Sequence, residues 1–412
     1  MEVKPGYKQT EVGIFPDEWT IEPLGRHATF RTGPFGSALH KSDYTSDGVP
    51  VVNPMHIVDG KIEPTRTMTI TEDAARNLSD FRIAPGEIVI GRRGDMGRCA
   101  VVQQSQLGWL CGTGSMIIRP RKADPEFLQW VLSSPRVISA IQDASVGTTM
   151  VNLNQGTLAG LKIQFPPLPE QGAIATALSD VDALLSGLDR LIAKKRDLKQ
   201  AAMQQLLTGE TRLPGFHGEW EVKRLGDLAE IVSGGTPRTT EPAYWNGGIK
   251  WCTPTDVTGC AGKYLNETER TISQLGLQNS GASLLPAGAL LLCSRATIGE
   301  VKIAAAEICT NQGFKSLVCL PGMSNEFLYY KLLTIKQKMV GRAFGSTFLE
   351  ISKANLAALE VNTPSLPEQT AIAAVLSDMD AEVAALEARR DKTRALKQAM
   401  MQELLTGRIR LV

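Results

Sequence analysis

A long helical segment occurs twice in this 412-residue chain, and the duplication constrains the fold more than any other feature. Residues 166–214 align with residues 364–412 at a constant offset without a gap, and 28 of the 49 aligned positions are identical. Each copy begins with Leu-Pro-Glu-Gln and later reads Leu-Leu-Thr-Gly. A solenoid unit spans only about 20–50 residues. We therefore infer a duplicated domain, each copy followed by its own long helix.

The two helices carry apolar residues in alternating steps of four and three, which is the a/d spacing of a coiled coil. The predicted seam comprises Ile174, Leu178, Val181, Leu185, Leu188 and Ile192 in the first copy, and Ile372, Leu376, Met379, Val383 and Leu386 in the second. Proline and glutamate suit the helix start, and Thr-Gly suits its end. A helix of about 37 residues would be roughly 55 Å long. We predict that the copies pack antiparallel as a rod with a globular domain at each end.

The duplication extends beyond the helices, because three further segments recur in register while the loops between them diverge. The matched pairs are residues 15–25 with 216–226, residues 84–97 with 285–299, and residues 147–153 with 345–351. We predict four parts: a first globular domain at 1–165, helix 1 at 166–213, a second globular domain at 214–363 and helix 2 at 364–412.

Short strands and few helices are predicted inside each domain. Apolar runs favour strands at residues 88–90, 101–102, 116–119, 290–292 and 315–319. Helical patterns cover residues 126–132 and 326–340, and residues 6–19 read as an extended lead-in. No alternation of strand and helix appears along either domain, so a mixed α+β fold with a curved sheet is expected rather than a doubly wound one.

Composition describes an ordinary soluble protein, with 43% hydrophobic residues, 21% charged residues and a net charge of +1. There is no apolar run long enough to span a membrane and no signal-peptide core, which predicts a cytoplasmic location. Seven scattered cysteines without a CxxC pair are interpreted as reduced thiols. Near-neutral charge neither requires nor excludes a polyanionic partner.

Signatures of catalysis and of metal binding are missing from the sequence. Gly262-Lys263 lacks the upstream glycine and the hydroxyl of a phosphate-binding loop. The four histidines form no zinc-binding array, and no GxSxG elbow occurs. We therefore expect a non-catalytic protein without a bound metal.

Polar and basic residues on glycine-rich loops are candidate contacts to a polyanion, since such loops present backbone N–H groups and hydroxyls to phosphates. The candidates are Arg31, Ser37, Arg92, Arg93, Arg98, Thr148, Thr149, Thr236, Arg238, Thr239, Lys250, Arg295, Lys315, Ser346 and Thr347. The alternative for each is a turn residue, or an arginine paired with a nearby acid. The basic residues at 194–196 and 389–390 are interpreted as a solvated helix face.

The lead-in at residues 6–19, the two Leu-Pro-Glu-Gln helix starts and the two Leu-Leu-Thr-Gly ends together resemble the specificity subunits of type I restriction–modification systems. The resemblance covers the whole chain. Residues 233–240 and the Tyr244-Trp-Asn-Gly-Gly248 stretch look typical of the family, whereas Gly33-Pro-Phe-Gly36 is a looser match.

The resemblance implies two target-recognition domains, each reading half of a bipartite double-stranded DNA sequence, and paired helices that set the spacer. It also implies that the helices dock two adenine methyltransferase subunits and that restriction/translocase subunits join the complex. S-adenosylmethionine, ATP and Mg would then belong to those partners rather than to this chain.

Other readings remain open. The chain could be the recognition portion of a fused restriction–methylation enzyme, or a solitary subunit recruited by another methyltransferase. From a different class, a coiled-coil scaffold could simply space two protein-binding domains. Divergent loops favour DNA recognition, because two identical protein partners would favour similar loops.

Overall fold

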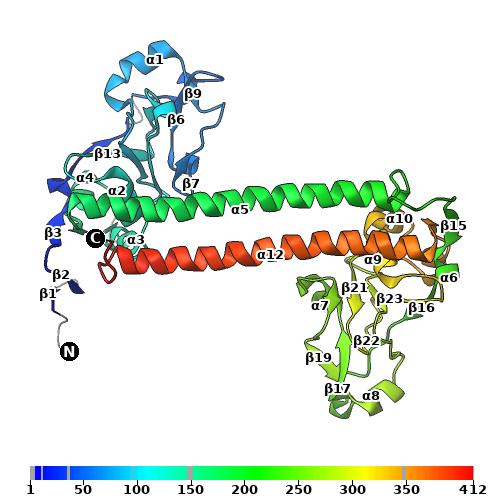
Figure 1. Ribbon diagram of the computed structural model, residues 1–412. Helices are drawn as coiled ribbons and strands as arrows, with labels where there is room; N and C mark the ends of the chain where they lie inside the picture. The colour runs from blue at the N-terminus through cyan, green and yellow to red at the C-terminus, as the bar shows by residue number, and fades with distance from the viewer. Residues whose placement is uncertain are drawn as a thin grey trace. The chain divides into compact units, whose positions relative to one another are not determined.

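The computed structural model describes residues 5–10, 13–34, 38–94, 96–145, 152–345 and 349–411. Two compact units divide the chain: unit 1 comprises Met1–Asp189 with Arg389–Val412, and unit 2 comprises Arg190–Ala388. The long helices α5 (Leu168–Thr208) and α12 (Leu366–Leu404) each contribute one part to each unit (Figure 1). They contain 41 and 39 residues, close to the expected length.

Unit 1 contains mostly short strands. These are β1 (Tyr7–Thr10), β2 (Gly13–Pro16), β3 (Thr20–Pro23), β4 (Ala28–Thr32), β5 (Tyr44–Thr45), β6 (Val49–Val52), β7 (Ile57–Val58), β8 (Lys61–Ile62), β9 (Thr69–Ile70), β10 (Ile88–Gly91), β11 (Cys99–Val101), β12 (Leu110–Cys111), β13 (Ser115–Pro120) and β14 (Lys162–Phe165). Its shorter helices are α1 (Glu72–Asn77), α2 (Pro125–Leu132), α3 (Pro135–Ser145) and α4 (Gln155–Gly160), with 3-10 turns η1 (Leu24–Arg26), η2 (Lys41–Asp43), η3 (Pro54–His56), η4 (Ser79–Phe81) and η5 (Gln104–Gln106).

Unit 2 repeats this plan with fewer elements. Its strands are β15 (Glu221–Arg224), β16 (Ala229–Ser233), β17 (Trp245–Cys252), β18 (Tyr264–Leu265), β19 (Arg270–Ile272), β20 (Leu290–Leu292), β21 (Val301–Ala304), β22 (Cys309–Thr310), β23 (Lys315–Cys319) and β24 (Glu360–Thr363). Its shorter helices are α6 (Leu225–Leu228), α7 (Pro254–Gly259), α8 (Gln274–Gln278), α9 (Asn325–Thr334), α10 (Lys336–Gly341) and α11 (Lys353–Ala357), with the 3-10 turn η6 (Pro242–Tyr244).

The predicted strands are present, and the mixed α/β class is confirmed. The helix expected at 326–340 was wrong in its continuity, because the chain forms α9 and α10 with a break at Ile335, whose φ of −105° and ψ of 13° are not helical. Apolar periodicity continues across the break, which is why the sequence pattern did not reveal it.

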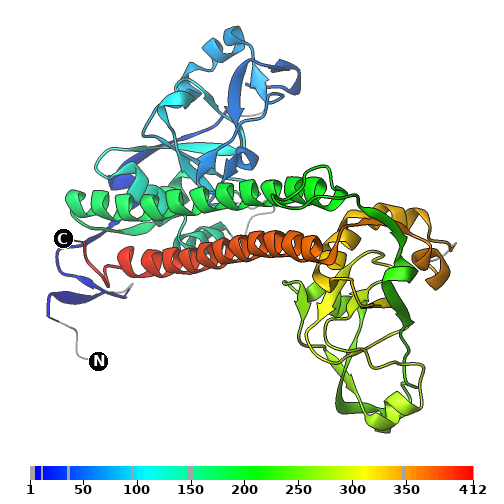
Figure 2. The same cartoon turned by 45° about the vertical axis from the view of Figure 1, so that its right-hand side comes forward.

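The first sheet of unit 1 is antiparallel, with strand order β11-β10-β13-β4. All four residues of β10 are buried, as expected of a strand covered on both faces. One face packs on α2 and on the ends of the two long helices. The other face packs on the region around β6 and the β7–β8 hairpin. A second sheet, with order β12-β6-β9-β5, lies with α1 on the side of the first sheet away from α5 (Figure 2).

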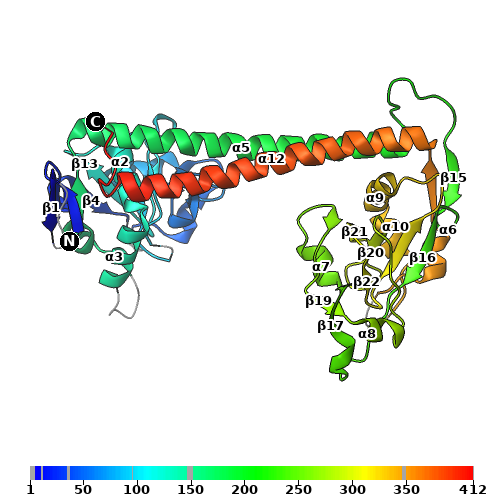
Figure 3. The same cartoon turned by 60° about the horizontal axis from the view of Figure 1, so that its bottom comes forward.

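The main sheet of unit 2 has strand order β16-β23-β20-β21-β18. Its helix-facing side packs on α9, on the start of α12 and on the end of α5. Its opposite side packs near α7. The small sheet β19-β17-β22 has its own core around the two indoles of Trp245 and Trp251. It lies beyond the main sheet as seen from α12 (Figure 3). Each unit therefore has a lobe near the helices and a second lobe built on a small sheet, which we call the distal lobe.

The glutamine of each Leu-Pro-Glu-Gln motif ties a domain helix to a long helix. In unit 1 the Gln171 Oε1 accepts a hydrogen bond of 2.9 Å from the backbone N–H of Asp124, the residue that caps α2. In unit 2 the Gln369 Oε1 accepts one of 2.8 Å from Ser324, which caps α9. The glutamine that recurs in both copies thus fixes where α2 and α9 meet the long helices.

The glutamate of each motif is a buried ion-pair partner. Glu170 is fully buried, accepts a 3.0 Å hydrogen bond from the Trp19 indole N–H, and pairs with Arg410, which follows α12. Glu368 pairs through both oxygens with Arg212, which follows α5, at 2.5 and 2.6 Å. The start of each long helix is therefore joined to the segment that follows the other one. We call these two sites the Glu170 joint and the Glu368 joint.

The predicted glycine ends are confirmed. Gly209 has φ +78° and Gly407 has φ +69°, the left-handed conformation that glycine adopts without strain after a helix. A Cβ on Gly407 would lie 2.6 Å from the Cδ of Pro16, and one on Gly209 would lie 3.2 Å from the Trp220 ring. Both ends are thus packed against the tryptophan-bearing lead-in of a domain.

The predicted seam is buried over most of its length in the first copy and only near the start of the helix in the second. Ile174, Leu178, Leu185, Leu188 and Ile192 are buried in α5, and Ile372 and Leu376 in α12. The remaining members, Val181, Met379, Val383 and Leu386, are half-buried. The seam is therefore only partly covered along the second copy.

The interpretation of the basic residues as a solvated face was wrong for Arg390 and Lys195, which are half-buried, and is confirmed for Arg196, which is exposed although it forms an ion pair. Arg390 lies 3.8 Å from Asp189 in unit 1, while Lys195 pairs with Glu382 at 2.6 Å and Arg196 with Glu387 in unit 2. The carboxylates belong to the other long helix, so spacing within one helix could not reveal them. Lys194 and Arg389 are exposed as expected.

Candidate nucleic-acid interface

The first pair of glycine-rich loops follows β4 and β16. The N–H of Gly33 donates to Ser115 O at 3.0 Å, and that of Gly235 donates to Thr310 O at 2.9 Å. A Cβ on Gly33 or on Gly234 would lie 2.0 Å from a carbonyl oxygen of the neighbouring loop. Close backbone approach therefore explains these glycines, and the backbone N–H groups of Gly33 and Gly235 are already used within the domain.

The second pair of loops follows β10 and β20, and the structure settles their alignment. The N–H of Arg92 donates to Gly114 O at 2.9 Å and its carbonyl accepts from Leu153, while Ser294 makes the same bonds to Gly313 and Ile351. Arg92 therefore corresponds to Ser294, and Arg93 corresponds to Arg295.

Arg92 is an interior residue rather than a surface contact. It is 5% exposed, and its Nε donates to the Asn152 side chain at 2.9 Å. Burial lowers the pKa of its guanidinium, with a contribution from neighbouring Arg93. Its role is to hold the returning chain at Asn152, which the sequence pattern could not distinguish from a role on the surface.

Arg295 and Lys315 converge on one carboxylate. Glu350 accepts from Arg295 Nε at 3.0 Å and from Lys315 Nζ at 3.3 Å. These cations hold the pKa of Glu350 below its ordinary value, chiefly through the Arg295 hydrogen bond. The alternative of an arginine paired with an acid holds for Arg295, and the single carboxylate of Glu350 balances one of the two positive charges.

Two further candidates also have acidic partners. Arg31 pairs with Asp80 at 2.6 Å and lies over the Phe81 ring. Lys250 donates to the Asn266 carbonyl and lies 3.2 Å from Glu267.

The remaining candidates divide into exposed residues and residues outside the described part of the chain. Arg93, Arg98, Thr236, Arg238 and Thr239 are exposed, with the Thr236 hydroxyl bonded to Gln312. Those outside the described residues are Ser37, Thr148, Thr149, Ser346 and Thr347.

The sequence analysis missed a stacked arginine in the distal lobe of unit 2. The Cζ of Arg270, on β19, lies 3.6 Å from the centroid of the Trp245 ring and 5.4 Å from that of Trp251, both on β17. The indole N–H of Trp245 also donates to the backbone carbonyl of Arg238 at 3.1 Å, so the backbone of Arg238 and the side chain of Arg270 contact the same indole. The two tryptophans were visible in the sequence, but Arg270 lies about 20 residues beyond them without a local signal.

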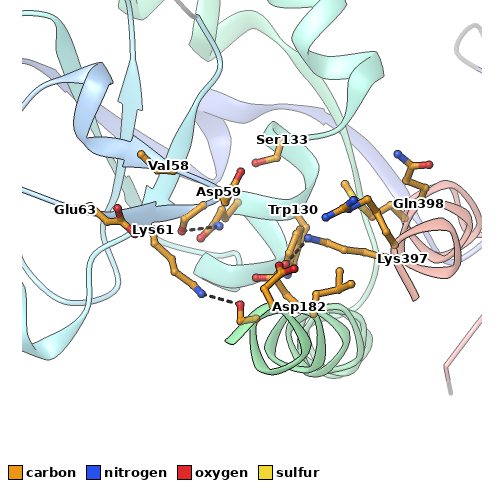
Figure 4. Close-up of a pocket in the computed structure, with 16 residues that line it drawn as sticks. Val58, Asp59, Lys61, Glu63, Trp130, Ser133, Asp182, Lys397 and Gln398 are labelled. Atoms are coloured by element: carbon orange, nitrogen blue, oxygen red, sulfur yellow. Dashed lines mark hydrogen bonds and ion pairs between the residues drawn. The ribbon is translucent and has the colours of Figure 1, made fainter. Parts of the chain in front are cut away.

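A polar pocket of about 490 Å³ lies in unit 1 between the β7–β8 hairpin, α2, α5 and α12 (Figure 4). Lys397 pairs with Asp182 at 2.5 Å and lies over the Trp130 ring, while Lys61 donates to the Ser186 hydroxyl at 3.1 Å. Trp130 donates to Ser179 at 3.4 Å. The pocket is thus bounded by contacts between the domain and the helices.

The equivalent place in unit 2 is more tightly bonded. Tyr330, in the position of Trp130, donates to Asp380 at 2.6 Å, and Lys199 pairs with the same carboxylate. Lys263 donates to the Ser377 hydroxyl at 2.6 Å and to Glu326 at 3.1 Å. The same node of aromatic, serine, aspartate and lysine therefore joins each domain to the helices, with a closed network in unit 2.

Little in the described residues points to catalysis. No group of three or more His, Cys, Asp or Glu side chains in that part could hold a metal ion. Burial raises the pKa of the Cys99 and Cys309 thiols to about 11, so both stay protonated near neutrality. No helix in this part of the chain combines the length and apolar character needed to cross a membrane.

Comparisons with known proteins agree with the repeated architecture. The model of a family described as "Type I restriction modification DNA specificity domain" matches residues 16–194 and 217–394. The type I restriction enzyme MjaIX specificity subunit of Methanocaldococcus jannaschii is 37% identical over 173 residues, which cover 42% of this chain and 40% of that protein. The putative MjaX specificity subunit of the same organism is 25% identical, over 98% of this chain and 97% of that one.

Two solved structures share the fold over nearly the full length. The HsdS subunit from Thermoanaerobacter tengcongensis superposes with a TM-score of 0.53 at 22% identity, over 96% of this chain and 98% of that one. The S subunit of a type I restriction–modification system from M. genitalium gives 0.60 at 16% identity, over 98% of both chains. At these identities the similarity concerns the fold.

Proposed function

Because this chain belongs to the family of type I restriction–modification DNA specificity subunits, we propose that each domain reads one half of a bipartite double-stranded DNA target. The observation that carries the proposal is the contrast within the repeat. The joints and nodes that attach each domain to the helices recur residue by residue, while the distal lobes differ. Different base sequences require different side chains on a common frame.

The paired long helices set the distance between the half-sites in this proposal. A helix gains about 1.5 Å per residue, so four residues inserted before Leu206 add roughly 6 Å. The insertion is expected to lengthen the unspecified spacer by one or two base pairs or to abolish recognition. An unchanged spacer would contradict the role of the helices.

The helices also dock two methyltransferase subunits in this proposal. Leu184, Leu191 and Leu198 recur every seven residues along α5 and are exposed, beside a seam that is only partly covered along the second copy. Such an apolar row suits packing against further helices. Restriction/translocase subunits would join through the methyltransferases.

In this proposal the chain has no catalytic activity of its own and is located in the cytoplasm. S-adenosylmethionine, ATP and Mg would be bound by its partners. The proposed domain limits, 1–165 and 214–363, rest on the ends of β14 at Phe165 and of β24 at Thr363, just before α5 and α12.

A methylome tests this function. The chain is expressed with its methyltransferase, and methyladenine is mapped across the host genome. We expect a split motif of two short specific halves around a fixed spacer, of which only one half changes when residues 1–165 are exchanged for those of a relative. Copurification without any methylation would contradict sequence recognition, and the absence of copurification would favour a scaffold for other proteins.

A further inference from the structure

The distal lobe of unit 2 holds one arginine in a fixed orientation at its surface. Arg270 is exposed, whereas Trp245 and Trp251 beneath it are 9% and 4% exposed. The two indoles are nearly perpendicular, with ring centroids 5.0 Å apart. The guanidinium group is therefore the outer layer of a stack whose inner layers are in the core of the lobe.

Hydrogen bonds hold both indoles in place. The Trp251 N–H donates to Gly235 O at 2.9 Å, and the Trp245 N–H donates to Arg238 O at 3.1 Å. In the sheet Trp251 pairs directly with Arg270 across β17 and β19. A guanidinium stacked on a fixed aromatic ring loses little further freedom on binding and keeps its N–H edge available as a donor.

The charge of Arg270 is not neutralised within the lobe. Lys250 lies near Glu267, and Arg295 and Lys315 share Glu350. In the residues that the structure describes, the side chain of Arg270 makes neither an ion pair nor a hydrogen bond, only the two ring contacts. Its N–H donors are thus free for a ligand.

The first domain has the same strands but not this stack. Val51 on β6 takes the place of Trp251 on β17. Val51 pairs in parallel with Leu110 on β12, and Trp251 pairs in parallel with Cys309 on β22, the equivalent strand of unit 2. The backbone N–H of Val51 donates to the carbonyl oxygen of Met68 at 2.9 Å, so Met68 takes the place of Arg270, which pairs with Trp251. The arginine and the indole beneath it therefore occur together in the second domain and are not part of the plan that the two lobes share.

We propose that Arg270 is a specificity-determining residue of the second domain, donating two hydrogen bonds to the O6 and N7 of a guanine in the half-site that this domain reads. This assignment rests on the proposed bipartite recognition. Arginine paired with guanine is the commonest specific contact in the major groove. An exposed, stacked and unneutralised guanidinium meets the geometric need of that contact.

The test uses the full chain in complex with its methyltransferase. Methylomes and initial methylation rates are compared for the wild type, Arg270→Met and Arg270→Lys. Methionine is the residue of the first domain at this place and can pack on the indole, and lysine keeps the charge without the planar fork. Arg342→Ala is the matched control, since Arg342 is an exposed arginine of the same unit that donates to a backbone carbonyl at 3.1 Å.

Both Arg270 variants are expected to accept other bases at one guanine position of one half-site, while the other half-site stays unchanged. The rate at the original site should fall about 10-fold to 100-fold, and Arg342→Ala should alter neither motif nor rate. Thermal melting of each complex is measured alongside, and an unchanged melting temperature is expected.

Three results would overturn the assignment. An equal fall in methylation rate at all sites with an intact motif would show that Arg270 contacts a phosphate. An unchanged motif and an unchanged rate would show that Arg270 only covers the two indoles. A lowered melting temperature with an intact motif would make its role structural. If the wild type itself gave no split motif, the proposed function would fail and this assignment with it, whereas a split motif that both variants leave intact overturns the assignment alone.

Discussion

The joints at the ends of the long helices are alike in the two copies of the repeat, whereas the distal lobes differ. At the Glu170 joint and the Glu368 joint, the same glutamate, arginine and glycine occupy equivalent places in both units. In the distal lobes, Val51 and Met68 stand where Trp251 and Arg270 stand. Each joint connects the start of one long helix to the segment after the other, so the same side chains are needed in both units. The distal lobes share their strand order, but their side chains are free to differ. The comparison teaches that attachment is kept constant while the presented side chains vary.

The largest expected effect is at the Glu170 joint. Glu170→Ala should lower the free energy of unfolding by about 3 kcal/mol, because it leaves the buried Trp19 N–H without an acceptor and Arg410 with only the exposed carboxylate of Glu18. Glu368→Ala should cost less, since only Arg212 loses its partner. Urea unfolding measures both, and hydrogen exchange shows which unit opens. Equal losses would mean that the two joints are energetically equivalent despite the extra tryptophan bond.

The glycines that end the helices give a second, smaller contrast. Alanine at position 407 should cost about 2–3 kcal/mol, combining a strained positive φ with overpacking against Pro16. Alanine at position 209 should cost only about 1–2 kcal/mol, because the neighbouring Trp220 ring is farther away. Thermal melting of the two variants checks the order. A reversed order would show that the lead-in of the first domain yields more easily than that of the second.

The polar nodes differ in how completely they are bonded, and one hydroxyl tests that difference. Tyr330→Phe should cost about 1 kcal/mol, because it removes the bond to Asp380 from a part-buried network. Tyr329→Phe is the matched control, since the neighbouring hydroxyl makes no hydrogen bond among the described residues. Urea unfolding midpoints compare them. A control as damaging as the test would mean that the hydroxyl bond contributes nothing specific.

The smallest effect is expected at Glu350 and depends on pH. Its folded-state pKa lies below the ordinary 4.5, so its stabilisation is present above pH 4.5 and is lost as the pH falls through the lowered value. Glu350→Gln should therefore destabilise the protein by under about 1 kcal/mol at pH 7. The difference from the wild type should disappear in acid. Unfolding curves between pH 7 and pH 3 measure it, and a constant difference would contradict the ion-pair account.

The repeated parts were predicted well from the sequence, because they depend on patterns among residues that lie near one another in the chain. The long helices, their glycine ends and the central strands follow from periodicity and from matched segments. Its weakest results concern single side chains on loops. Arg92 and Arg93 are adjacent in sequence, yet one is interior and the other exposed. That difference depends on Asn152, 60 residues away, which no local pattern encodes.

The alternation of two similar domains with two long helices can be read from the amino-acid sequence, since apolar spacing and duplication are patterns along the chain. Which charged side chains find a partner depends on the folded structure. Lys195, Arg295 and Lys315 find carboxylates on distant segments, while Arg270 finds two indoles. The physical reason is that ion pairs and ring contacts depend on distance in space, and folding brings together residues whose separation along the chain carries no signal.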